Sequence, residues 1–394
     1  MASVCLYFQI HQPTRLGKFT VFSEKVPYFD DDRNRKYLER AAMKCYLPTN
    51  ATLLDLIDDI GERFRIAFSL TGVFIEQCQK YSPEVLESLK QLSDTGNVEF
   101  LSETYYHSLA ALFSLEEFEK QIMLHRGLIR DLFNQGPKVF RNTEAMYSNE
   151  IAETVEKLGY DGIITEGHES ILGWRSPNYL YRPEGCKSIV ALLRNYKLSD
   201  DIGFRFSAPW WKEYPLTADK YAKWLSACEG DCINIFLDYE TFGEHQWKET
   251  GIFEFLETMP YEILTYENLD FKTPSEIIEA YKPVGVIDVP KVISWADIQR
   301  DTSAWLENEM QRSAFEQMAK LERSVKTNRE LLHIWRLLQT SDHFYYMCTK
   351  WFADGDVHKY FNPYDSPYDA FINYMNILQD LKRRLATESK LISF

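Results

Sequence analysis

The chain has 394 residues, of which 45% are hydrophobic and 26% charged, so it is long enough for one large globular domain with an appended segment. Its formal net charge of −15 disfavours nucleic acids and anionic membranes as partners, because an acidic surface repels both. The seven scattered cysteines match no zinc-binding spacing, and no targeting or membrane-spanning segment stands out. We therefore expect a cytoplasmic protein with reduced thiols.

The first half of the chain alternates predicted strands with predicted helices. Short apolar runs predict strands at residues 4–10, 65–70, 98–101, 139–140 and 162–165. Helices are predicted at residues 51–60, from Pro83 onward, from 115 to about 133 and at 149–158. Residues 16–50 are predicted to form a long polar and aromatic loop. The alternation of the two element types indicates an α/β fold.

The pattern of predicted elements changes near residue 300. Before it, strands are predicted at 188–194 and 232–237, helices at 217–228, 251–259 and 275–281, and an extended stretch at 292–297. After it, helical periodicity covers roughly residues 302–325, 328–352 and 367–388. We therefore predict a catalytic domain at 1–300 and a helical region at 301–394. A polar stretch at 339–343 lies inside the second of these helices and is either a solvated face or a face that covers the mouth of the site.

Ionisable side chains follow many of the predicted strands. They are His11, Glu103, His107, Glu144, Glu166, His168, Asp238, Glu240 and His245. A (β/α) barrel assembles its active site from such strand ends, so we expect these side chains to converge on one pocket. Two carboxylates on different strands are the groups that cleave glycosides: one attacks the anomeric centre and the other protonates the leaving oxygen. The aromatic neighbours of Asp238 would disfavour its ionised form, which suits a proton donor.

Five segments, in order along the chain, resemble the five short sequence regions that mark glycoside hydrolase family 57. They are residues 11–13, 96–107, 140–144, 236–245 and 341–346. The resemblance implies an incomplete, TIM-like (β/α)7 barrel followed by a C-terminal helical segment that completes the active-site cleft. It also implies retaining hydrolysis of α-1,4-glucans without a metal or other cofactor. By position, Glu144 matches the nucleophile and Asp238 the acid/base.

The same resemblance supplies candidates for substrate contact. His11, His107 and Asp342 match substrate-site residues, and the further candidates inside the motifs are Gln12, Glu99, Glu240 and His245. Trp210 and Trp211 are either a platform for sugar rings or a hydrophobic anchor. The motifs are shared by α-amylases, 4-α-glucanotransferases and branching enzymes. In its short form, without a β-rich C-terminal domain, the sequence most resembles the α-amylase-type members of the family.

Two hypotheses of other classes remain open. A metal-dependent polysaccharide deacetylase would need clustered His and Asp ligands, but no H-x-x-x-H pair occurs and the first strand ends in His-Gln. A non-catalytic α-glucan-binding protein would keep the fold without the activity, although both carboxylates, Glu144 and Asp238, are present. Chain-length preference, the ratio of hydrolysis to transfer and the oligomeric state are not indicated by the sequence.

Overall fold

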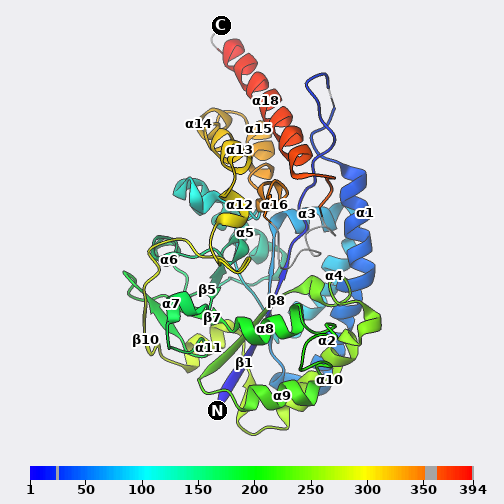
Figure 1. Ribbon diagram of the computed structural model, residues 1–394, viewed down its shortest axis with the longest axis vertical. Helices are drawn as coiled ribbons and strands as arrows, with labels where there is room; N and C mark the ends of the chain where they lie inside the picture. The colour runs from blue at the N-terminus through cyan, green and yellow to red at the C-terminus, as the bar shows by residue number, and fades with distance from the viewer. Residues whose placement is uncertain (24–25, 351–361, 393–394) are drawn as a thin grey trace.

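The computed structural model describes residues 1–23, 26–350 and 362–392. Figure 1 shows a strand-containing body with helices packed around it and a group of helices beyond the C-terminal end of strand β1. This is the α/β fold that the alternation of elements predicts. Among the described residues, none of the helices has the length and apolar character that a membrane span requires.

The strands form two five-stranded sheets. The first has the order β3-β2-β1-β8, with β9 also paired to β1; its strands are β1 (Ala2–Ile10), β2 (Ile66–Leu70), β3 (Val98–Phe100), β8 (Cys232–Asp238) and β9 (Leu269–Phe271). The second has the order β10-β6-β7-β5-β4; its strands are β4 (Val139–Arg141), β5 (Gly162–Glu166), β6 (Tyr181–Pro183), β7 (Val190–Arg194) and β10 (Gly285–Ile287). All pairs are parallel except β6 with β7.

The two sheets are hydrogen-bonded to each other at two places. Just after β3, the Ser102 amide donates to the Val139 carbonyl at 2.9 Å, and the Arg141 amide donates to the Ser102 carbonyl at 2.8 Å. Just after β7, the Asn195 amide donates to the Asn234 carbonyl in β8 at 2.9 Å. The bridge between Ser102 and Phe140 is parallel, so the C-terminal ends of the parallel strands of both sheets face the same side of the molecule, while β6 and β10 run the other way.

Helices cover the outer faces of the sheets, which is why every residue of β1 is buried. Their bounds are α1 (Asp31–Ala41), α2 (Leu47–Ile60), α3 (Gly72–Tyr81), α4 (Pro83–Asp94), α5 (Leu115–Phe133), α6 (Asn149–Lys157), α7 (Glu169–Leu172), α8 (Tyr196–Gly203), α9 (Ala218–Ser226), α10 (Ile252–Leu264) and α11 (Pro274–Ala280). The Ser114 side chain accepts from the Glu117 amide at 3.2 Å and caps the N-terminus of α5.

The prediction of a loop over residues 16–50 is wrong for its second half. Helix α1 and a π-helical turn at Ala42–Tyr46 lie there. The acidic run before α1 is a helix start: Asp30 accepts from the Arg33 amide at 2.9 Å, and Asp31 pairs with Lys80 at 2.6 Å. The predicted extended stretch at 292–297 is also not a strand, since only Ile293 forms a bridge, with Tyr147.

The C-terminal region is helical, but its helices are shorter than predicted. They are α12 (Ser303–Leu306), α13 (Glu309–Ala319), α14 (Glu322–Val325), α15 (Arg329–Leu337), α16 (Ser341–Tyr345) and α18 (Pro367–Ile392). The predicted helix at 328–352 is broken after Leu337, and its residues 351–352 lie outside the described part of the chain.

The polar stretch at 339–343 is the reason for this break. Thr340 forms an antiparallel bridge with Ser108, and the Leu109 amide donates to the Gln339 carbonyl at 3.2 Å. The Ser341 amide donates to the His107 carbonyl at 2.9 Å. Backbone groups that an uninterrupted helix would use are thus paired with the strand-bearing body. The polar residues therefore form a junction between the two parts of the chain. Gln339, Thr340, Ser341 and His343 are buried there, so the stretch is not a solvated helix face.

Candidate active site

A cavity of about 740 Å³ opens at the C-terminal ends of the strands. The predicted site residues that line it are His11, Gln12, His107, Glu144, Trp210, Asp238, Glu240, His245 and Asp342. Parallel strands bring most of these residues together because each one follows, or lies close behind, a strand that ends on this side. Asp342 comes instead from α16, which the junction with residues 107–109 holds against the strand ends.

Five of the predicted residues do not line the cavity: Glu99, Glu103, Glu166, His168 and Trp211. Glu99 lies in β3, where its carboxylate accepts from the Ser275 amide at 2.9 Å and from the Ser275 hydroxyl at 2.5 Å at the start of α11. The ring of Trp211 packs edge-on against Trp224, 6.0 Å away between centroids. Trp210 does line the cavity and is 79% exposed, so its ring is open to solvent at the rim.

Glu144 is held by three side chains from three parts of the chain. Its Oε1 accepts from the Ser341 hydroxyl at 2.9 Å and lies 3.3 Å from Nε2 of His107. Its Oε2 accepts from Nε1 of Trp295 at 2.9 Å. The backbone of Glu144 is left-handed, with φ of 56°, in a tight turn directly after β4. Such a conformation is costly for a non-glycine residue and is maintained only where its surroundings fix it.

His107 lies between two carboxylates. Its Nδ1 is 3.3 Å from Oε2 of Glu103, and its Nε2 is 3.3 Å from Oε1 of Glu144. Burial opposes a charge on the ring, but the hydrogen bonds to Glu103 and Glu144 outweigh it and raise the pKa of His107 to about 9. In return, although burial opposes ionisation, the hydrogen bond from His107 lowers the pKa of Glu144 to about 2.

Asp238 ends β8 and lines the same cavity, but its pKa is raised whereas that of Glu144 is lowered. Burial raises its pKa to about 6, against the attraction of the nearby Arg141 and with the repulsion of Glu144 adding to it. The two carboxyl groups therefore differ in their readiness to ionise: Glu144 is an anion at neutral pH, and Asp238 holds a proton in mildly acidic solution. Such a difference is what assigns acid and base roles to paired carboxyls.

Two residues that follow Asp238 also line the cavity. Glu240 accepts from the Tyr46 hydroxyl at 2.5 Å; burial and the neighbouring Asp238 raise its pKa to about 8. Gln12 donates to the same Tyr46 hydroxyl at 3.0 Å. Burial lowers the pKa of His245 to about 4, so that its ring is neutral at physiological pH. The wall formed by Gln12, Glu240 and His245 is thus polar, with hydrogen-bonding groups that face the cavity.

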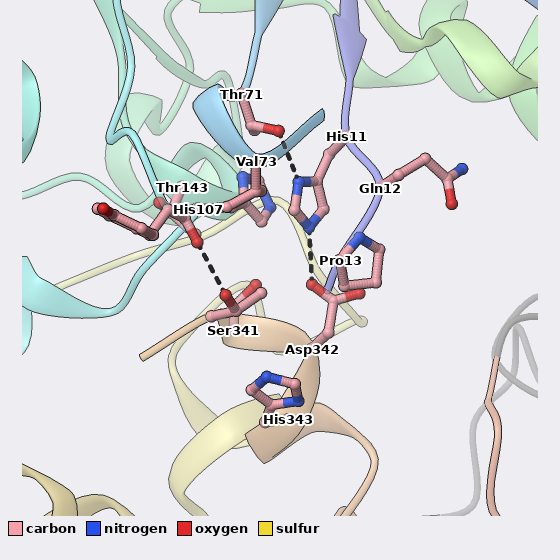
Figure 2. A network of polar contacts seen from close by, with 12 residues as sticks. His11, Gln12, Pro13, Thr71, Val73, His107, Thr143, Ser341, Asp342 and His343 are labelled. Atoms are coloured by element: carbon pink, nitrogen blue, oxygen red, sulfur yellow. Dashed lines mark hydrogen bonds and ion pairs between the residues drawn. The ribbon is translucent and has the colours of Figure 1, made fainter. Parts of the chain in front are cut away.

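His11 joins the strand-bearing body to the C-terminal region. Figure 2 shows its ring between Thr71 and Asp342, with Nδ1 2.9 Å from the Thr71 hydroxyl and Nε2 3.0 Å from the Asp342 carboxylate. His11 also stacks on His107, with centroids 3.9 Å apart and planes inclined by 21°. In the described part of the chain, donor atoms of His11, His107 and Asp342 lie within 4.8 Å of one another, close enough to be considered as metal ligands.

The orientation of the rings does not suit a metal site. A histidine binds a metal through a lone pair that lies in the plane of its ring, so two ligating rings must have planes that meet at the ion. The nearly parallel, stacked planes of His11 and His107 do not converge in this way.

With this geometry, the chain can be compared with known proteins. Residues 5–290 match the family described as Glycosyl hydrolase family 57. The chain belongs to glycosyl hydrolase family 57. This confirms the family that the five sequence segments predict, and with it the expectation of a glycoside hydrolase.

Relatives and solved structures agree with this membership. The chain is 48% identical over 394 residues to a protein of Methanocaldococcus jannaschii named "Putative alpha-amylase", covering 95% of this chain and 83% of that protein. It is 25% identical to the α-amylase of Pyrococcus furiosus, in a match over 64% of this chain and only 38% of that longer protein. The fold matches a family 57 branching enzyme from Thermococcus kodakaraensis with a TM-score of 0.72 at 14% identity, over 99% of this chain and 91% of that one.

Ser341, Arg141 and Trp295 were not among the predicted site residues, whereas Glu103 was expected in the pocket and does not line the cavity. Ser341 directly precedes the predicted Asp342, and its neighbour could have drawn attention to it. Glu103 follows a predicted strand, but it lies behind His107 and is fully buried. Arg141, also fully buried, packs on the ring of Trp295 with its Cζ 4.5 Å from the centroid. Trp295 had no usable signal, because it lies in an irregular segment more than a hundred residues from Glu144.

The hydrogen bond from Trp295 to Glu144 predicts a loss of activity in Trp295→Phe. The substitution keeps an aromatic ring but removes the donor, and a hydrogen bond to a charged group is worth about 1.5–3 kcal/mol. We expect kcat to fall roughly tenfold to a hundredfold. Trp335→Phe is the matched control, because Nε1 of this buried residue donates to the Met318 carbonyl at 2.8 Å, away from the cavity.

The control variant should lose stability and keep its kcat per folded molecule. Steady-state kinetics, combined with thermal unfolding of both variants, measures the two effects separately. Equal kcat values for Trp295→Phe and Trp335→Phe would contradict a role of the indole N–H at Glu144.

Proposed function

We propose that this family 57 enzyme is a retaining hydrolase of α-1,4-glucans, with Glu144 as the nucleophile and Asp238 as the acid/base. The observation that carries the proposal is the pair of carboxyl groups in one cavity, with pKa values of about 2 for Glu144 and about 6 for Asp238. Similarity to proteins named as α-amylases supports α-glucans as the substrate class. The polar cavity wall and the exposed rim residue Trp210 support a carbohydrate ligand.

The proposed reaction has two displacements. In the first, an oxygen of Glu144 attacks the anomeric carbon as the bond to the glycosidic oxygen breaks, and that oxygen takes the proton of Asp238. In the second, Asp238 removes a proton from water, which attacks the same carbon and releases Glu144. Each step inverts the anomeric centre, so the product keeps the α-configuration. The hydrogen bonds of His107, Trp295 and Ser341 hold the attacking carboxylate in place.

We also propose that the strands close into the incomplete (β/α)7 barrel expected for the family. The interstrand bonds after β3 and after β7 support a continuous ring of β1, β2, β3, β4, β5, β7 and β8. The division near residue 300 is a further part of the proposal, with residues 301–394 completing the cleft through Ser341 and Asp342. A cytoplasmic location remains the prediction of the sequence, compatible with the free cysteines of the described chain.

Purified enzyme should shorten maltoheptaose, amylose and glycogen and release new reducing ends. Chromatography of the products, combined with a reducing-sugar assay, checks this expectation. Products longer than the substrate without a net gain of reducing ends would instead indicate a 4-α-glucanotransferase, and new branch points would indicate a branching enzyme. If folded protein binds these glucans and leaves them unchanged, the chain is a binding protein and the proposed hydrolysis is wrong.

The acid role of Asp238 predicts the alkaline limb of the pH profile. Its folded-state pKa is raised, so the proton needed by the leaving oxygen is present below about pH 6 and is lost as the pH rises through that value. For malto-oligosaccharides, kcat/KM should therefore decline above about pH 6. In Glu240→Gln the same limb should persist, because Glu240 titrates higher, at about 8. A limb that moves with Glu240→Gln would assign the acid to Glu240.

A further inference from the structure

Glu103 is the carboxylate of the Glu144–His107 network that does not reach the cavity. It is fully buried behind His107, and its Oε1 has no hydrogen-bond partner among the described residues. Its backbone amide donates to Nδ1 of His125 at 3.2 Å. Removing a carboxylate from water costs several kcal/mol unless other groups compensate for it. The compensating group at Oε2 is His107, whose Nδ1 is 3.3 Å away.

The two nitrogen atoms of the His107 ring both face carboxylate oxygens. A neutral imidazole donates from one nitrogen only, and its other nitrogen would direct a lone pair at an anion. An imidazolium donates from both and therefore fits Glu103 on one side and Glu144 on the other. The stack on His11 keeps the ring from turning away, and the left-handed backbone of His107, with φ of 49°, fixes its position.

Gln9 offers the competing arrangement. Its amide nitrogen lies 3.3 Å from the same Nδ1, and as a donor it would require that nitrogen to be unprotonated. The oxygen and nitrogen of an amide can exchange places by rotation about the last side-chain bond. With its oxygen towards the ring, Gln9 becomes a second acceptor for the Nδ1 proton. The two arrangements differ in the protonation of Nδ1, which can be measured.

We propose that Glu103 is a positioning residue that keeps His107 doubly protonated, so that His107 remains a charged hydrogen-bond donor to Glu144. The inference rests on the proposed nucleophilic role of Glu144. When Glu144 becomes a glycosyl ester it loses its negative charge, and the attraction between it and His107 weakens. Glu103 keeps its charge through this step. His107 therefore stays protonated and can receive the Glu144 carboxylate again when the ester is hydrolysed.

Other titratable and charged side chains surround the Glu103–His107 pair. The titratable or charged side chains that act on it are Tyr7, His11, His125, Arg141, Glu144, Asp238 and Asp342. Burial lowers the pKa of His125, which contacts the Leu70 carbonyl through Nε2 at 2.7 Å. Arg141 attracts Glu103 and Glu144 alike. In the absence of Glu103, the remaining charges would hold the His107 proton less tightly.

The test uses α-glucosyl fluoride, because fluoride departs without a proton and the measured step then depends on Glu144 and its donors. Enzyme with and without Glu103→Gln is compared in an Asp238→Asn, Glu240→Gln background, where neither residue 238 nor residue 240 can titrate. With Glu103 intact, the alkaline limb of kcat/KM should lie near the pKa of His107, about 9. In Glu103→Gln, that limb should move down by at least about one pH unit, because the imidazolium loses the anion that faces its Nδ1; one unit corresponds to about 1.4 kcal/mol.

Two further measurements make the result decisive. His107→Asn should abolish the limb altogether, which identifies the titrating group. Glu117→Gln is the matched control for the loss of a buried carboxylate: Glu117 is fully buried, is paired with Arg336 at 2.7 Å and does not line the cavity, and its variant should keep the limb in place. An alkaline limb that does not move in Glu103→Gln would overturn the proposal.

The unaltered enzyme provides a test that does not depend on the folding of any variant. Nitrogen-15 NMR of labelled histidines should show both ring nitrogens of His107 protonated at neutral pH. A neutral ring with an unprotonated Nδ1, bonded to Gln9, would overturn the proposal and leave the function of the enzyme intact. If the enzyme turns over no glucosyl substrate, the proposed function fails, and the NMR result still decides the state of His107.

Discussion

The orientation of one carboxylate, that of Glu144, depends on contacts from distant parts of the chain. His107 comes from the segment after β3, Trp295 from the segment after β10, and Ser341 from the start of α16. Ser341 is brought to Glu144 by the antiparallel bridge between Ser108 and Thr340, which fastens the C-terminal helices to the strand ends. The junction between the two parts of the chain therefore also supplies a hydrogen bond to the proposed nucleophile.

The balance of buried charge explains why these groups can stay ionised next to one another. The ring of Trp295 has guanidinium groups of Arg141 and Arg194 within cation–π distance, 4.5 and 5.7 Å from its centroid. Arg194 is itself paired with Glu166 at 3.1 Å and with Asp200 at 2.6 Å. Acidic and basic groups thus alternate outward from Glu144. The hydrogen bond from His107 keeps Glu144 ionised, while burial, acting against the attraction of Arg141 and Arg194, raises the pKa of Asp238.

Local sequence pattern predicts the parts of this structure that depend on local physics. Strand ends rich in His, Asp and Glu foretold the cavity lining at His11, His107, Glu144 and Asp238, because the period of a strand and the parallel order of a sheet fix where such side chains go. Of the three-residue strands, β3 and β4 were predicted from their apolar residues, whereas β6 and β9 were missed, because three residues alone give no periodicity. The break between α15 and α16 was missed because a contact with residues 107–109, remote in sequence, overrides the helical pattern.

The family segments also contain a residue that was predicted to contact substrate but does not line the cavity. Glu99 lies inside one of the family segments, yet it holds the start of α11 through Ser275. Conversely, Trp295 lies in no motif and contacts Glu144 directly. What separates the two is tertiary position: strand β3 directs Glu99 towards α11, while the irregular segment after β10 returns Trp295 to the strand ends. The spacing of residues along the sequence does not indicate the tertiary position of Glu99 or of Trp295.

The central claim, that Glu144 forms a covalent bond to the sugar, is tested most directly by trapping the intermediate. Incubation of the enzyme with 5-fluoro-α-glucosyl fluoride should add one fluoroglucosyl group to the protein, since the ring fluorine slows both steps while the activated leaving group speeds only formation of the ester. Mass spectrometry of the proteolysed adduct should place the label on Glu144. A label on Asp238 or Glu240, or turnover with β-configured first products and no adduct, would contradict the account.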